Sequence, residues 1–200
     1  MRPPRTAGAR PDQSHRAGGD KGRTGDQELD PRDLAKDLAA AADERTTLVA
    51  FLRYQRDTLE VKCARLDAAD MARRSVEPST LSLLGLVRHL ADMERIWFRC
   101  VMAGQDVPER FSSQEDGDGA FDRAVPDPAI VSEAWDAWRA EVAFTDDFVA
   151  AASDLDVAGS DAYHDAVSLR WVLVHLVEEY ARHNGHADLL RQRIDGAVGQ

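Results

Sequence analysis

A glutamate and a histidine four residues apart, Glu179 and His183, lie in the middle of a long apolar repeat near the C-terminus. The repeat runs from Ser168 to Asp195 and places apolar side chains at steps of three and four, the spacing of one helix face. Residues four apart on a helix are neighbours, and both side chains bind divalent metals. Burying such groups unpaired costs several kcal/mol. Two interpretations follow: a metal site, or a Glu–His hydrogen bond that satisfies a buried pair.

Three other histidines could extend this pair. His89 lies on the apolar flank of an earlier helical repeat, where a histidine with a satisfied hydrogen bond is also common. Together with Glu179 and His183 it would give three protein ligands and leave a position for water or substrate, the pattern of a catalytic metal site. His186 and His175 flank the pair. We expect His186 either to contact the ligands or to serve as a reserve ligand, and His175 is the weaker candidate for either role.

Four long helical repeats must position these residues. We expect them at 48–66, from Ser79 or Thr80 to 103, from Asp127-Pro128 to 149, and at 168–195. The connection at 104–127 is long and acidic, and connections of this length are often functional lids. No stretch alternates with period two, so we expect no β-sheet. The pattern predicts an all-α four-helix bundle, a fold in which facing helices assemble metal sites in the core.

The rest of the sequence limits the classes of protein to which this chain can belong. Residues 1–28 have almost no large apolar side chain and are predicted to be a disordered tail, so that the domain comprises 29–200, with an amphipathic lead-in from Leu34 to Ala42. The net charge of −11 argues against nucleic acid as a partner. Without a membrane-length apolar run or an apolar signal core, we expect a cytoplasmic protein. His15 and His164 are expected to have no role in the site.

Two strings carry a family resemblance: LLGLVRHLADMERIWF around His89 and SLRWVLVHLVEEYARHNGHADLLRQRIDG around Glu179 and His183. From about residue 44 to 196 the chain resembles the DinB/YfiT-like superfamily, especially its actinobacterial branch. It is also similar to mycothiol-dependent S-transferases and to the N-terminal domain of maleylpyruvate isomerases. The resemblance implies an antiparallel bundle with one long crossover, often a homodimer, and a divalent metal held by these three residues.

The family pattern differs here at two positions. Many members have histidine where this chain has Glu179, and many have glutamine where it has His186.

Zinc suits a His/His/Glu site best, with nickel, iron and manganese as alternatives. Related enzymes conjugate a small thiol to an electrophile, and the excess of arginine over lysine, typical of GC-rich bacteria, favours mycothiol. The alternatives are a non-enzymatic metal-stabilised stress-response or binding protein, and a hydrolase that uses metal-bound water.

Overall fold

The structure, a computed structural model, describes residues 42–160 and 166–198. The predictions for the tail at 1–28 and its histidine, for residues 34–41 of the lead-in and for His164 concern residues outside these ranges. In the described part of the chain, no helix is both long enough and apolar enough to cross a membrane.

Three of the long helices begin where local side chains cap them. They are α2 (Glu44–Cys63), α6 (Pro128–Ala151) and α7 (Leu169–Asp195). Each cap accepts a hydrogen bond from a backbone N–H two or three residues further on, at 2.8 to 3.2 Å. In the same order, the caps are Asp43, Asp127 and Ser168. α7 ends at Gly196, whose φ of 82° suits glycine. The predicted ranges agree to within four residues.

The second long helix begins later than predicted. α4 (Leu83–Glu94) starts after Ser82, not at Ser79 or Thr80. The buried Ser82 hydroxyl accepts a hydrogen bond from the Gly85 N–H at 3.1 Å and so sets the first turn. α4 continues directly into a π-helical segment, η2 (Arg95–Met102). η2 lies within the range that was predicted as one helix, and the spacing of its apolar residues did not indicate the wider turns of a π-helix, which are rare.

Short elements occupy the connections. They are α3 (Ala68–Ala72), α5 (Gly119–Asp122), β1 (Ala158–Gly159) and β2 (Val167–Ser168). The expectation of no β-sheet was wrong, because β1 and β2 pair antiparallel, with Ala158 opposite Ser168. Two-residue strands are too short to alternate visibly. α5 lies within the connection that was expected to be a loop.

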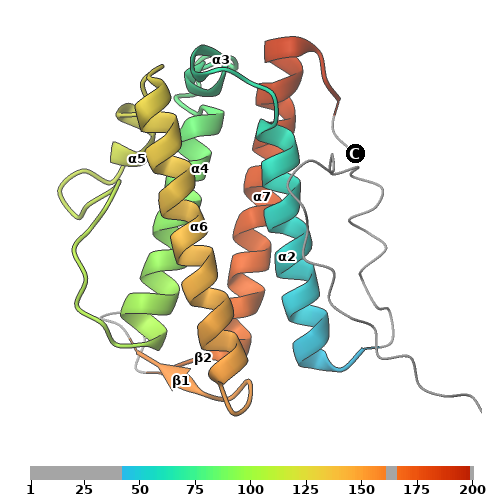
Figure 1. The fold of residues 1–200 in the computed structure, drawn as a ribbon, viewed down its shortest axis with the longest axis vertical. Helices are drawn as coiled ribbons and strands as arrows, with labels where there is room; N and C mark the ends of the chain where they lie inside the picture. Colours follow the sequence, from blue (N-terminus) through green and yellow to red (C-terminus); the bar gives the residue numbers. More distant parts are fainter. Residues whose placement is uncertain (1–41, 161–165, 199–200) are drawn as a thin grey trace, which may run out of the picture.

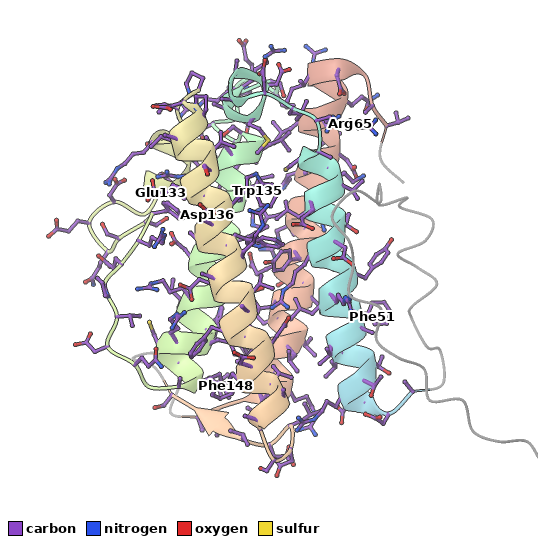
Figure 2. The ribbon with its side chains drawn as sticks, viewed as in Figure 1. Phe51, Arg65, Glu133, Trp135, Asp136 and Phe148 are labelled. Carbon is purple, nitrogen blue, oxygen red and sulfur yellow. The ribbon has the colours of Figure 1, made fainter. Side chains whose placement is uncertain are left out.

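The four long helices lie side by side. Figure 1 shows α6 and α2 in front, with α4 behind α6 and α7 behind α2. α2 packs on α7, and α4 packs on both α6 and α7. Along α6, Trp135 and Asp136 lie in the half nearest α3 and Phe148 lies near the other end (Figure 2). The largest fully buried apolar side chains between the helices include Leu59, Leu86, Leu90, Phe98, Leu173 and Leu176.

One buried carboxylate, that of Glu94 on α4, binds side chains from the three other long helices. It is fully buried and accepts two hydrogen bonds from Arg56 at 2.8 Å, one from Thr145 at 2.6 Å and one from Tyr180 at 2.9 Å. Burial raises the pKa of Tyr180 well above its usual range, so its hydroxyl stays protonated and donates. Trp138 in turn donates to the Tyr180 oxygen at 2.7 Å and is a core residue. The four bonds offset the desolvation cost of Glu94.

Candidate metal centre

His89 on α4 meets Glu179 and His183 on α7 in the seam between these helices. The Nε2 atom of His183 lies 3.3 Å from Oε2 of Glu179, and Nε2 of His89 lies 3.7 Å from the same oxygen. The two imidazole rings are 4.7 Å apart and meet edge to face. One ligand atom from each residue lies within 4.8 Å of the other two. The fold therefore gathers the three residues that the sequence suggested as ligands.

The contacts within this group leave a polar atom unsatisfied. Nε2 of His89 is buried and has no hydrogen-bond partner in the described structure, because 3.7 Å to Glu179 is beyond hydrogen-bond range. Two ligand atoms that are each about 2.1 Å from a tetrahedral zinc lie about 3.4 Å apart. The separations of 3.3 and 3.7 Å therefore suit atoms that share one cation better than atoms that share a proton. The donor set fits a divalent metal.

The protonation state of the site also favours a cation. Burial is the main cause that lowers the pKa of His89, against the attraction of Glu179. For His183, burial and then the neighbouring His89 lower the pKa to about 4. Both imidazoles are therefore neutral at pH 7, with lone pairs free to bind. Neutral imidazole is the form that binds metals, so no proton has to be displaced from these two residues.

An aromatic side chain from the acidic connection 104–127 covers one side of the site. The ring of Phe121 stacks on His89, with 5.6 Å between ring centres. Gly85, one turn before His89 on α4, makes room for this contact: a Cβ atom there would lie 2.6 Å from Phe121. The connection thus forms a wall of the site and shields the His89 ring from water.

Two charged residues near His89 on α4 hold the connection 104–127 against this helix by hydrogen bonds. Arg88 donates to the carbonyl oxygen of Ala120 at 2.9 Å, and Asp92 accepts from the backbone N–H groups of Phe111 and Ser112 at 3.2 and 2.8 Å. Sequence reasoning missed both anchors. The sequence did contain a signal for them. Arg88 and Asp92 stand near His89 in a strongly apolar helix, and charged residues are rarely buried in such a place unless they are paired.

Two further side chains contact the candidate ligands on α7. Nδ1 of His186 lies 3.3 Å from Nδ1 of His183, so one ring can fix the orientation and tautomer of the other. Arg182 places Nη1 3.3 Å from Oε1 of Glu179, the carboxylate oxygen turned away from the two histidines. Sequence reasoning included His186 but not Arg182. Arg182 could have been found, because it lies three residues after Glu179 and is therefore its neighbour on the helix surface.

His175 belongs to an aromatic cluster one turn before Glu179 on α7. Its ring stacks on Trp171, with centres 5.0 Å apart, and meets the edge of Trp97 at 4.8 Å. Its Nδ1 lies 3.8 Å from a carboxylate oxygen of Glu178. His175, Glu178 and Glu179 form a second group with metal-ligand spacing. Arg182 pairs with both of these carboxylates, so this second group already has a cation.

Long helices that place a His/Glu/His group in one interhelical seam define the class of DinB-like helical proteins. A family model described as MST, mycothiol-S-transferase, matches residues 47–196, and the chain belongs to that family. A conserved protein from Enterococcus faecalis with a solved structure shares the fold, with a TM-score of 0.54 and 18% identity over 78% of this chain and 100% of the other. No curated protein matches the sequence.

Proposed function

We propose that this protein is a divalent-metal-dependent S-transferase that conjugates mycothiol to a small electrophile. In this proposal, the helices form an antiparallel four-helix bundle with 104–127 as its long crossover. The family match supports the choice of thiol. The observation that carries the proposal is the buried, unpartnered Nε2 of His89 beside Glu179 and His183. A satisfied structural histidine would not leave this atom bare.

In this proposal, different side chains have different roles. His89, Glu179 and His183 would hold the metal, with zinc the best match to the donor set. The bound cation would supply positive charge that lowers the pKa of a thiol, so that the nucleophilic thiolate exists at neutral pH. His186 and Arg182 would keep His183 and Glu179 in the required orientation.

The chemical step is a nucleophilic substitution at carbon. The thiol gives its proton to solvent, its sulfur forms a bond to the electrophilic carbon, and the leaving group departs with the bonding electron pair. Phe121, stacked on His89, would limit water on one side of the site. This exclusion favours the thiol over water as the nucleophile.

The test is turnover by untagged protein that has been stripped of metal and reloaded with zinc. With mycothiol and a fluorogenic bimane electrophile, we expect thioether formation that requires both metal and thiol. His89→Ala and His183→Ala should bind metal more weakly by orders of magnitude and lose turnover, whereas His15→Ala, a matched control in the tail, should behave as wild type. Metal binding without thiol-dependent turnover would indicate a non-enzymatic metal-stabilised protein. Metal-dependent ester cleavage without thiol would indicate a hydrolase.

A further inference from the structure

Three aromatic side chains form a cluster next to the candidate metal centre, in the same seam between the helices. Trp171 of α7 stacks on His175, with 5.0 Å between ring centres and 16° between ring planes. Trp97 of η2 packs against Trp171 at 5.1 Å and against His175 at 4.8 Å. Trp171 is 44% exposed, so part of the cluster is open to a ligand. In Figure 1, α4 and α7 lie behind α6 and α2, so this seam is on the far side of the view.

The cluster and two of the candidate ligands form one row of side chains along α7. Trp171, His175, Glu179 and His183 follow one another at steps of four residues, so each is the neighbour of the next on the helix surface. At ~1.5 Å per residue, His175 lies about 6 Å along the helix from Glu179, and Trp171 lies about 12 Å from it. Beside Trp171 there is also a pocket of about 310 Å³, whose other walls come from β1, β2 and Ala166.

The candidate metal centre has different neighbours at its two ends. At one end, four residues before His89, Gly85 makes room for Phe121, and this ring stacks on His89 and covers the site. At the other end, eight residues after His89, Trp97 belongs to the partly exposed cluster. A thiol whose sulfur is bound at the metal would therefore extend over the cluster rather than past Phe121.

Mycothiol, the thiol of the proposed function, has dimensions that match this row. Its N-acetylcysteine is joined by an amide bond to glucosamine, which carries an inositol ring. Five bonds separate the sulfur from the first ring, a reach of about 6 Å when extended. This reach brings the first ring to the level of His175 and the second ring to that of Trp171. Ring C–H groups carry a small positive charge, which suits the negative faces of aromatic side chains.

Two charged side chains beside the cluster provide partners for hydroxyl groups. Glu178 and Arg182 are exposed and form an ion pair, and a carboxylate oxygen of Glu178 lies 3.8 Å from Nδ1 of His175. A carboxylate has about four lone-pair sites and a guanidinium group has five N–H donors, so both retain capacity for a hydroxyl group. A ligand that combines ring faces with hydroxyl groups therefore fits this surface better than a purely apolar electrophile.

We propose that Trp97, Trp171 and His175 bind the sugar part of mycothiol, with glucosamine over His175 and Trp97 and inositol over Trp171. This inference rests on the proposed function, because it takes the identity of the thiol from it. The cluster would select a large, sugar-linked thiol over a small one. Its side chains would hold the thiol in position and would take no part in the making or breaking of bonds.

The first measurement is a ligand-observed NMR titration of the full-length, metal-free protein with glucosaminyl-inositol, the sugar part of mycothiol without its cysteine. In wild type, we expect saturable binding below about 10 mM. Trp171→Ala should weaken this binding about 5- to 20-fold, whereas Trp171→Phe, which keeps an aromatic face, should retain most of it. Trp135→Ala is the matched control and should bind as wild type, because Trp135 lies on α6 and packs on Trp138 (Figure 2).

The second measurement compares mycothiol with N-acetylcysteine, which lacks both rings, on zinc-loaded protein. Wild type should have a kcat/KM at least about tenfold higher for mycothiol, and Trp171→Ala should lower this preference by raising the KM for mycothiol. Absence of turnover with either thiol would contradict the proposed function. The sugar titration would still decide this inference, because it needs neither metal nor electrophile.

Four results would overturn the inference. The first is no binding of glucosaminyl-inositol to wild type at about 10 mM, and the second is an equal kcat/KM for the two thiols. The third is binding by Trp171→Ala that recovers at higher protein concentration together with a dimeric mass in light scattering, which would assign the cluster to a subunit interface. The fourth is a Trp171→Ala variant that keeps its preference between thiols but loses a preference for aromatic electrophiles, which would assign the cluster to the electrophile.

Discussion

Replacing His89 with leucine distinguishes between two roles of this residue, that of a metal ligand and that of a structural histidine. In the metal-free protein, Nε2 of His89 is buried without a partner, and such a group costs about 1–3 kcal/mol. Leucine has a similar volume and no polar side-chain atom. His89→Leu should therefore raise the free energy of unfolding of the metal-free protein by about 1–2 kcal/mol, which corresponds to a rise in Tm of roughly 2–8 °C for a chain of this size.

The sign of this effect should reverse when metal is present. Wild type at a metal concentration of about 100 times Kd gains about 2.7 kcal/mol, whereas the variant, which lacks a ligand, gains little. The assay is calorimetric unfolding of both proteins after chelation and again after zinc is added. His175→Leu is the matched control: its ring is already partnered by Trp171 and Trp97, so its loss should not stabilise the protein. If metal-free His89→Leu is less stable than wild type, His89 is a satisfied core residue and our argument is wrong.

Three further predictions concern the site and the assembly. His186→Ala should weaken zinc binding about 10- to 100-fold in titration calorimetry; an unchanged affinity would show that His186 does not support His183. The folded-state pKa of His183, about 4 against a usual 6.5, means that the unfolded chain takes up the proton first as the pH falls. Urea unfolding of the metal-free protein should therefore show stability lost between pH 6.5 and 4, by roughly 2 kcal/mol after solvent screening, and His183→Gln should flatten this profile. Finally, Ile96, Trp171 and Val174 are 43%, 44% and 51% exposed, so we expect a homodimer in light scattering at tens of micromolar protein; a monomeric mass would contradict this.

The sequence predicts features whose causes are local. Helix starts at Asp127 and Ser168 could be predicted because each cap acts on a backbone group within three residues. Glu179 and His183 could be grouped because one helix turn joins them. His89 required the further assumption that two helices of the predicted bundle face each other in the right register, an assumption that the family resemblance then supported.

The features that sequence reasoning missed depend on contacts between distant segments. The stacking of Phe121 on His89 and the anchoring of its connection by Arg88 and Asp92 join residues about 20 to 30 positions apart. No periodicity encodes such a contact. The start of α4 was predicted too early for a related reason. Ser79 and Thr80, which precede the buried Ser82, are also residue types that cap helices. Burial, which decides between them, is a property of the whole fold.

The hydrogen bond between Glu94 and Tyr180 has a consequence for the alignment of α4 against α7. Glu94 follows His89 by little more than one turn, and Tyr180 directly follows Glu179, so this bond and the candidate metal centre join neighbouring levels of the same two helices. A slip of one residue would shift a helix by ~1.5 Å and rotate its side chains by ~100°. That slip would detach Tyr180 from the Glu94 carboxylate, which is fully buried, and would carry Glu179 away from His89. The buried network thus fixes the register of α4 against α7, and with it the positions of His89, Glu179 and His183, without any contribution from a bound cation.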